Sequence, residues 1–451
     1  MALRPRDNQP GTHGREPCRI GCTLRPAGLG ASMELSQTVE KSPLRATGRS
    51  VRRLSRRAGF WAVAFSFLVV AAFSTAPSSL YGLYEQREHL SSLTITFAYA
   101  IYAVGVVGSL VLAGHVPDWY GRRMVLLPAI TVAIAAAVLL LAWRSLPGLL
   151  VARVLTGVAV GAAVPTATAF ITDLDSGPAG LPTRRAAIVS TIANIGGLAL
   201  GPLIAGVLAR YEQHGLTLPF LVFVAALALA GIAVAVAPEG HPPVHPRPRY
   251  RPQHLSLPAN ARRRFTAAAA GAFLCFAVFG LFAGLAGAFL AGPLHHPSAA
   301  LCGLTILLSF GTGVVVQTTT TDWRAHRLIA AGIVPSLIGL GLLVASAWTS
   351  PPSLALFLIG GIVSGAGGGA IFRGSLTLVI SASNPDDRAG VLATFFIAGY
   401  AGLSVPVLGL GIALQHLSPR VTLLIFALIV GLGILAAAPV LVRPPDANSG
   451  P

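Results

Sequence analysis

The charged segment from Gly114 to Met124 stands between two apolar stretches. Its sequence is GHVPDWYGRRM, in a chain of which only 10% of the residues are charged. An aspartate and two arginines at this spacing can form charge-assisted hydrogen bonds that are made and broken, as in an ionic latch. The alternative is a basic turn that only fixes the orientation of the flanking segments.

The segments that must position this loop are strongly apolar. Hydrophobic residues make up 54% of the 451 residues. Apolar runs of about twenty residues recur along almost the whole length, which is typical of transmembrane helices. The 50 glycines and 33 prolines are also tolerated in membrane spans. The composition therefore predicts an all-α membrane protein that crosses the bilayer many times.

Twelve apolar windows form two groups of six. The first six lie at about 59–84, 92–114, 124–142, 147–172, 186–209 and 217–238, and the second six at about 265–291, 298–319, 328–348, 353–380, 389–414 and 420–441. We expect a disordered basic tail, two six-helix bundles around a linker, and a second tail. Their predicted boundaries are 1–58 (tail), 59–238 (bundle), 239–264 (linker), 265–441 (bundle) and 442–451 (tail).

The arginines predict the orientation of the chain. With the N-terminal tail inside, the inner loops carry most of the arginines, and the outer face has only Arg87, Arg144, Arg210 and Arg420. The positive-inside rule then predicts cytoplasmic termini and a multi-pass protein of a bacterial-type plasma membrane. The net charge of +17 lies mainly in these loops and the N-terminal tail, so we expect no nucleic-acid partner. The first 58 residues hold no apolar core of a signal peptide, and the start could be Met1 or Met33.

The two halves repeat each other. Asp118 and Arg123 recur in the second half as Asp322 and Arg327, in the segment TTTTDWRAHR. A repeat that spans half of the chain predicts two pseudo-symmetric bundles related by an axis along the membrane normal.

The charged loop closely resembles the signature loop of the major facilitator superfamily, G-x-x-x-D-R-x-G-R-R. The matching residues are Gly114, Asp118, Gly121, Arg122 and Arg123. One position departs, because Trp119 stands where the family usually has Arg. The resemblance extends from the first to the twelfth span. It implies a secondary transporter that alternates between inward-open and outward-open states and works as a monomer.

The resemblance implies that this loop is a latch holding the outward-open state. Asp173, at the end of the fourth span, is the expected partner of the latch arginines, and an exposed loop carboxylate is the alternative. Arg153 resembles the family's fourth-span arginine, which is implicated in proton transfer. Its alternative is a side chain that snorkels to the membrane surface.

The fifth span resembles the Gly-Pro motif that the family associates with exporters. The matching residues are Gly197, Gly201, Pro202 and Gly206, while Ala205 replaces a glycine. The proline predicts a kink and the glycines predict close helix packing, which could seal an interface against ion leak. Generic glycine packing is the alternative. The branch that the chain resembles most is the drug:proton antiporters.

The family architecture places the first, fourth, seventh and tenth spans around a cavity. Its candidate polar residues here are Ser78, Tyr81, Thr166 and Arg373. This thin polar content, with several phenylalanines in the seventh span, favours a hydrophobic or amphiphilic cargo. No acidic residue lies near the centre of a predicted span, which leaves open an uptake symporter or facilitator for a small metabolite.

Other function classes lack sequence support. The chain has no G-x-x-x-x-G-K-[ST] loop, no G-x-S-x-G elbow and no H-E-x-x-H motif, so we expect neither ATP hydrolysis nor another enzyme activity. The four cysteines have no metal-site spacing, and we expect no metal and no cofactor. The leading hypothesis is proton-coupled export of small hydrophobic or amphiphilic compounds. A non-transporting membrane sensor or enzyme is the alternative from another class.

Overall fold

The regular elements of the computed structural model are all helices within the residues that it describes. These residues are 54–113, 120–176, 183–211, 215–239, 255, 257, 262–384 and 387–442. In this part of the chain, 12 helical runs are long and apolar enough to cross a membrane. The all-α fold with twelve spans, predicted from the sequence, is confirmed. We number the spans in chain order.

The first six spans are built from eleven helical elements, because the first and fifth spans are irregular. The elements are α1 (Arg56–Thr75), η1 (Ala76–Leu80), α2 (Tyr81–Glu88), α3 (Ser92–Ala113), α5 (Arg122–Ala142), α6 (Leu146–Leu174), α7 (Arg184–Thr191), η2 (Ile192–Gly196), α8 (Gly197–Leu208), η3 (Ala209–Tyr211) and α9 (Thr217–Val236). The first span consists of α1, η1 and α2, and the fifth of α7, η2, α8 and η3.

The last six spans are single helices. They are α10 (Arg262–Ala291), α11 (Ala299–Thr319), α12 (Ala325–Trp348), α13 (Leu354–Ser381), α14 (Arg388–His416) and α15 (Pro419–Leu441). Helix α1 begins inside the predicted N-terminal tail, and α10 begins inside the predicted linker. Most of that linker lies outside the described residues.

Hydroxyl side chains begin several of these helices. Ser55 and Thr183 accept hydrogen bonds from the backbone N–H groups of Ala58 and Ala186, at the starts of α1 and α7. Ser298 and Ser418 do the same at the starts of α11 and α15. Such caps satisfy backbone donors that have no helical partner, and so define where an apolar run becomes a helix.

Exposed aromatic rings lie near both ends of the spans. Trp143, Tyr211 and Trp348 lie at the ends of odd-numbered spans, with exposed fractions of 47%, 78% and 53%. Tyr120 and Trp323 lie near the starts of odd-numbered spans and are also exposed. Tryptophan and tyrosine prefer the membrane–water interface, so these rings agree with a bilayer between the two ends.

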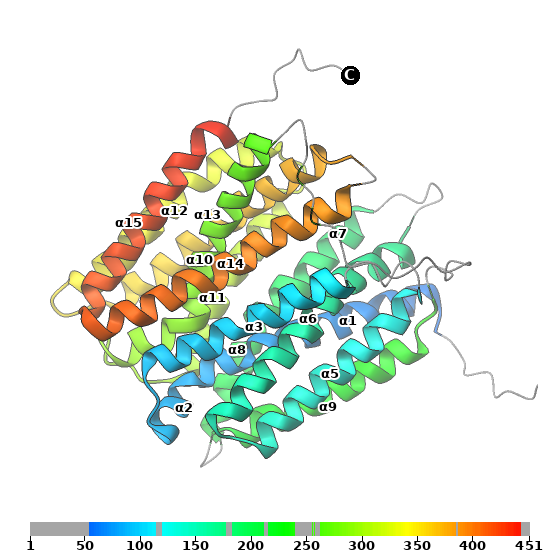
Figure 1. Cartoon of the computed structure of the whole chain (residues 1–451), viewed down its shortest axis with the longest axis horizontal. Coiled ribbons are helices and arrows are strands. Elements are labelled where there is room, and N and C mark those ends of the chain that lie inside the picture. The colour runs from blue at the N-terminus through cyan, green and yellow to red at the C-terminus, as the bar shows by residue number, and fades with distance from the viewer. Residues whose placement is uncertain are drawn as a thin grey trace, which may run out of the picture. The chain divides into compact units, whose positions relative to one another are not determined.

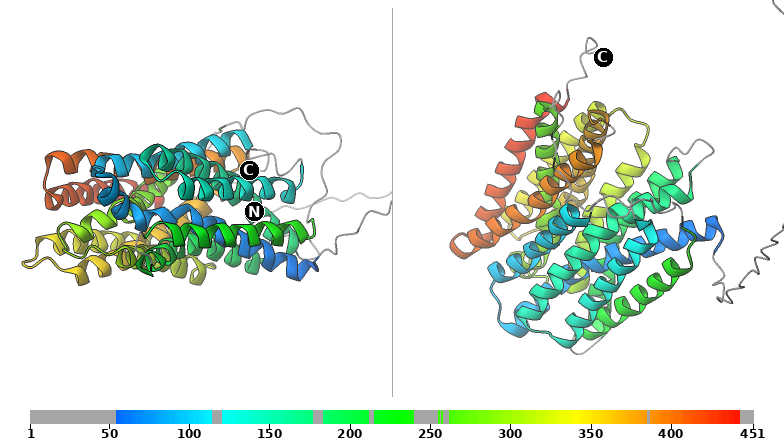
Figure 2. Two further views of the ribbon diagram at one scale, coloured as in Figure 1. Left: turned by 90° about the horizontal axis from the view of Figure 1, so that it is seen from below. Right: turned by 45° about the vertical axis from the view of Figure 1, so that its right-hand side comes forward.

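The two halves contact each other along two pairs of helices. Helix α8 packs on α11, and α3 packs on α14 (Figure 1). Figure 2 shows the same packed helices from two further directions, with the first half in blue to green and the second half in green through yellow to red. We call the end of the spans with Arg122, Arg184 and Arg324 the basic end, and the other the opposite end.

Candidate functional site

The charged loop of the first half is described only from Tyr120 onward. Gly114 and Asp118 lie outside the described residues. Gly121, directly before α5, has a φ of 94°, in the left-handed region that favours glycine. A Cβ atom there would lie 3.2 Å from the Glu239 carboxylate. Gly121 therefore permits the tight turn that starts the third span beside an acidic side chain.

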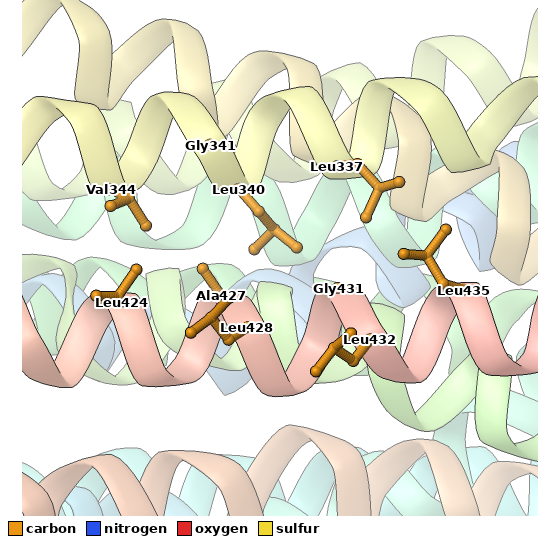
Figure 3. Close-up of a pocket in the computed structure, with 10 residues that line it drawn as sticks. All are labelled: Leu337, Leu340, Gly341, Val344, Leu424, Ala427, Leu428, Gly431, Leu432 and Leu435. Carbon is orange, nitrogen blue, oxygen red and sulfur yellow. The ribbon is translucent and has the colours of Figure 1, made fainter.

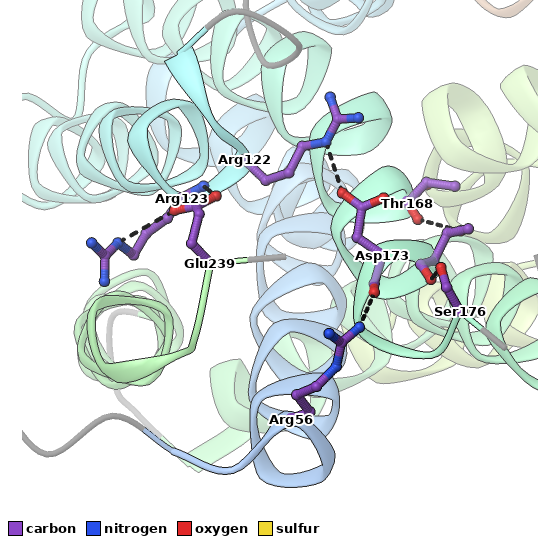
Figure 4. Close-up of polar contacts among 8 residues, drawn as sticks. Arg56, Arg122, Arg123, Thr168, Asp173, Ser176 and Glu239 are labelled. Carbon is purple, nitrogen blue, oxygen red and sulfur yellow. Dashed lines mark hydrogen bonds and ion pairs between the residues drawn. The ribbon is translucent and has the colours of Figure 1, made fainter. Parts of the chain in front are cut away.

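Arg122 contacts Asp173, the carboxylate that the sequence suggested. Its Nε lies 3.2 Å from Oδ2 of Asp173, and the two side chains are 13% and 21% exposed. Arg56 at the start of α1 also donates a hydrogen bond of 2.6 Å to the backbone oxygen of Asp173 (Figure 4). These contacts join the first, third and fourth spans, all within the first half.

Arg123 contacts Glu239, an acidic residue that sequence reasoning missed. The Nε of Arg123 lies 3.7 Å from Oε2 of Glu239, and its backbone N–H donates to Oε1 at 3.3 Å. Its guanidinium also donates to the backbone oxygen of Ala235 (Figure 4 draws the ion pair). The signal in the sequence was an acidic residue directly after the sixth span.

The second-half copy of the loop makes a contact across the halves. Asp322 Oδ2 lies 3.1 Å from a terminal nitrogen of Arg184, which starts the fifth span. The Nε of Arg184 also donates to the hydroxyl of Thr321 at 3.2 Å. Both charged side chains are well exposed, at 63% for Arg184 and 75% for Asp322. Sequence reasoning identified Asp322 but not its partner.

The glycines of the fifth span lie against the first span. A Cβ atom at Gly197 would lie 2.6 Å from the backbone oxygen of Leu68. At Gly201 it would overlap the backbone oxygen of Ala72. These positions accept no larger side chain without movement of the backbone, so the first and fifth spans pack at the closest possible approach.

The same motif also packs on the second half. A side chain at Gly206 would overlap the backbone oxygen of Ala299 at the start of α11. A side chain at Gly303 would in turn overlap the backbone oxygen of Pro202. The Gly-Pro motif therefore contributes directly to the seam between the fifth and eighth spans, at the opposite end.

Pro202 leaves a backbone acceptor free, and the first span satisfies it. In an α-helix, the carbonyl of Leu198 would accept from residue 202, but proline has no N–H. The hydroxyl of Thr75 donates to that carbonyl at 2.9 Å. One turn earlier the fifth span forms the π-helical segment Ile192–Gly196. The kink is therefore an irregular helix whose freed carbonyl has a partner on a neighbouring span.

Arg153 is buried in the protein, with 1% of its surface exposed. A terminal nitrogen of its guanidinium donates a hydrogen bond of 2.6 Å to the backbone oxygen of Ser74. The guanidinium also lies 4.6 Å from the ring centre of Tyr102. The Ser74 oxygen is available because α1 ends at Thr75 and the following 3-10 turn contains Pro77, which has no N–H. The alternative of a side chain that snorkels to the membrane surface is wrong for this structure.

An aromatic cluster connects the halves near the middle of the spans. Tyr102 on α3 and Tyr400 on α14 share a hydrogen bond, with ring centres 6.3 Å apart. Tyr400 also contacts Phe276 of α10, which contacts Phe372 of α13 at 5.1 Å. Tyr102 is 5% exposed, whereas Tyr400 and Phe276 are half-buried. The sequence did not suggest this tyrosine pair, because the pairing of the second and eleventh spans is visible only in three dimensions.

The other candidate cavity residues are mostly buried. Thr166 donates to the backbone oxygen of Ala162 in its own helix. The hydroxyls of Ser78 and Tyr81 are buried without a hydrogen-bond partner. Arg373 on α13 is half-buried and lies within electrostatic range of Asp322.

A groove of about 340 Å³ lies elsewhere, between the ninth and twelfth spans (Figure 3). It is lined by ten residues without a charged or polar side chain: Leu337, Leu340, Gly341, Val344, Leu424, Ala427, Leu428, Gly431, Leu432 and Leu435. Leu428 and Leu432 are exposed on a span, where apolar side chains face lipid. The groove therefore fits lipid chains rather than the charged and aromatic groups described above.

A sequence profile of the Major Facilitator Superfamily matches residues 63–349, which is more than half of the chain. The chain belongs to this superfamily. It is a multi-pass membrane protein, and its family function is the transport of small molecules across a membrane rather than an enzymatic reaction.

Relatives of known function resemble parts of this chain or its fold. The Bacillibactin exporter of Bacillus subtilis (strain 168) is 27% identical over 132 residues, which is 28% of this chain and only 33% of the exporter. Solved structures with the same fold include a mutant of the nucleoside transporter NupG, with 13% identity and a TM-score of 0.66, covering 84% of this chain and 99% of that one. The human organic anion transporter TETRAN has 16% identity and a TM-score of 0.61, covering 85% and 100%.

Proposed function

We propose that the chain is a secondary active transporter that exports small hydrophobic or amphiphilic compounds in exchange for protons. The observation that carries the export direction is the Gly-Pro motif of the fifth span. Pro202 and Gly206 pack against the backbone of α11, so the motif seals the seam between the halves where leak must be prevented. The partial similarity to an exporter agrees with this direction.

Alternating access requires that each end of the seam can open. Among the described residues at the basic end, the exposed Arg184–Asp322 pair connects the halves, and exposed pairs contribute at most about 1 kcal/mol. At the opposite end the contact is close backbone packing around Gly206. We propose that the latch around Asp118, Arg122 and Asp173 biases this exchange, and that Asp118, Asp173 or groups near Arg153 couple it to protons.

The cargo surface in this proposal is the half-buried aromatic pair Phe276 and Tyr400. Aromatic rings bind apolar groups by their large contact area and by ring stacking. We further propose that the basic end faces the cytoplasm of a bacterial-type cell, as the positive-inside rule suggests, and that one chain suffices for transport.

The test is a compound-tolerance screen in an efflux-deficient bacterial host, with the wild type and Asp118→Asn in parallel. We expect the wild type to raise tolerance to several amphiphilic compounds, a protonophore to abolish the effect, and Asp118→Asn to reduce it. Net accumulation of a labelled metabolite inside the cells would instead establish uptake. Full activity of Asp118→Asn would remove the gating role of the loop.

A further inference from the structure

Arg153 is the one buried charge among the residues that the structure describes. The ion pairs in the described ranges involve other arginines, and no carboxylate contacts Arg153. A charged side chain inside a membrane protein is costly unless a partner or a polar cavity compensates it. Four arginines at the basic end, Arg122, Arg123, Arg184 and Arg185, are paired with carboxylates, so an arginine without a carboxylate inside a span calls for a functional explanation.

The groups around Arg153 are neutral and leave hydrogen-bond donors unused. Its guanidinium makes one hydrogen bond, to the Ser74 backbone, and its Nε is buried without a partner. The hydroxyl of Tyr81, within electrostatic range of Arg153, and that of Ser78 one turn before it are also buried and unpartnered. The Nε–H of Arg153 and the O–H of Tyr81 are thus unused donors at a positive charge, and the site lacks only an acceptor with negative charge.

Aromatic rings continue from this site toward the half-buried part of the seam. The guanidinium lies 4.6 Å from the ring centre of Tyr102, and that ring contacts Tyr400 across the halves. Tyr400 in turn contacts Phe276. A bound molecule with an anionic group at Arg153 would therefore have aromatic surface beside it for an apolar body.

We propose that Arg153, with Tyr81, binds the anionic group of the transported compound, so that the cargo is an amphiphilic organic anion. Its apolar body packs on Tyr102, Tyr400 and Phe276. The anion reaches Arg153 when Tyr102 separates from Tyr400, because Tyr102 covers the guanidinium in the described conformation. This inference names the substrate class of the proposed transporter and rests on its carrying amphiphilic compounds, not on the direction of transport.

The test is a binding measurement with three matched fluorescent probes on the purified full-length chain in lipid nanodiscs. The probes are 1-pyrenebutyrate, its methyl ester and 1-pyrenebutylamine, which share the apolar body and differ in charge. We expect the wild type to bind the anion about tenfold more tightly than the ester, as for one charge-assisted contact. Arg153→Gln should lose this preference and still bind the ester, and Arg153→Lys should keep part of it.

The control is Arg210→Gln, which removes an exposed arginine at the end of the fifth span and should leave the preference unchanged. Equal affinities in the wild type, a preference for the amine, or an unchanged preference in folded Arg153→Gln would each overturn the proposal. If Arg153→Gln does not fold, Tyr81→Phe removes one donor and should weaken anion binding by about threefold, with no change for the ester. No loss in that variant would count equally against the site.

Two further experiments distinguish this inference from a site for inorganic anions and from the proposal of export. Replacing chloride by gluconate should not alter pyrenebutyrate binding, and complete competition by chloride would make the site one for inorganic anions. If the chain exports neutral compounds in the tolerance screen and shows no preference for anions, the anion site is refuted and export is not. If the chain prefers anions but accumulates them inside the cell, export is refuted and the anion site is not.

Discussion

The seam between the halves is built differently at its two ends. At the opposite end, Gly206 and Gly411 lie directly against the backbone of Ala299 and the side chain of Thr96. At the basic end, the contact of Arg184 with Asp322 is ionic and exposed. Close packing is lost abruptly when atoms overlap or separate, whereas an exposed ion pair is weak and is screened by salt. The difference indicates that the opposite end sets the geometry of closure, and the basic end tunes how easily the halves part.

The largest effect is expected from Gly206→Val, which breaks the packed end. The new side chain would overlap the Ala299 backbone, so the opposite end could not close. We expect the transport rate to fall by more than about tenfold, which corresponds to a destabilisation of the closed state by more than ~1.4 kcal/mol. The measurement is the transport rate in proteoliposomes.

The matched control is Gly409→Val, because a Cβ atom at that position meets nothing within 4 Å. It introduces the same side chain into a span of the other half. A comparable loss in both variants would show that valine damages the helices, not the seam.

The next effect is expected within the first half, where Asp173→Ala leaves Arg122 and its partly buried guanidinium without the carboxylate. We expect a loss of about 2 kcal/mol in the free energy of unfolding, because hydrogen bonds to charged groups contribute about 1.5–3 kcal/mol. Thermal unfolding of the purified protein measures it. Asp173→Asn, which keeps an acceptor oxygen, should lose less, and an equal loss would contradict the role of the carboxylate as acceptor.

A smaller effect is expected from Tyr400→Phe, which removes a hydrogen bond between the halves but keeps the ring. The equilibrium between the closed and the separated seam should shift by about 1 kcal/mol toward the separated state. Distances between spin labels on α3 and α14 report the population of the separated state. Phe396→Leu, on the same helix but outside the tyrosine pair, serves as control.

The smallest effect on stability is expected from Asp322→Ala, at the exposed end. The free energy of unfolding should change by less than about 1 kcal/mol, while the distance between labels on α7 and α12 shifts toward the open state. About 0.5 M salt should produce the same shift in the wild type and none in the variant. A salt response that survives in Asp322→Ala would mean that other charges control this end.

The sequence was sufficient for the fold because membrane helices are local features. Apolar length and arginine position are properties of neighbouring residues, and they gave all twelve spans to within a few residues. The partner of Arg122 was also accessible, since Asp173 is one of few acidic residues near a span end. Glu239 and the pair of Arg184 with Asp322 were not, because contacts between distant spans depend on how the helices pack.

The environment of Arg153 shows the same limit. Its position six residues inside a span suited both a buried site and a snorkelling side chain, and only packing against Tyr102 decides between them. The local sequence does contain one signal, Pro77, because in the 3-10 turn that follows α1 this proline stands where an N–H would otherwise bond to the Ser74 carbonyl. A proline in one span can thus mark where a polar side chain of another span binds.

The hydrogen bond from Thr75 to the Leu198 carbonyl makes Thr75 of the first span and Pro202 of the fifth span thermodynamically interdependent. Pro202 frees the Leu198 carbonyl, and inside the membrane this carbonyl is satisfied by the Thr75 hydroxyl. Substituting Thr75 alone, which leaves the Leu198 carbonyl unsatisfied, should therefore cost more than substituting Thr75 together with Pro202. The first and fifth spans are joined at the bend itself, so this part of the first half should rotate as one rigid lever when the seam opens.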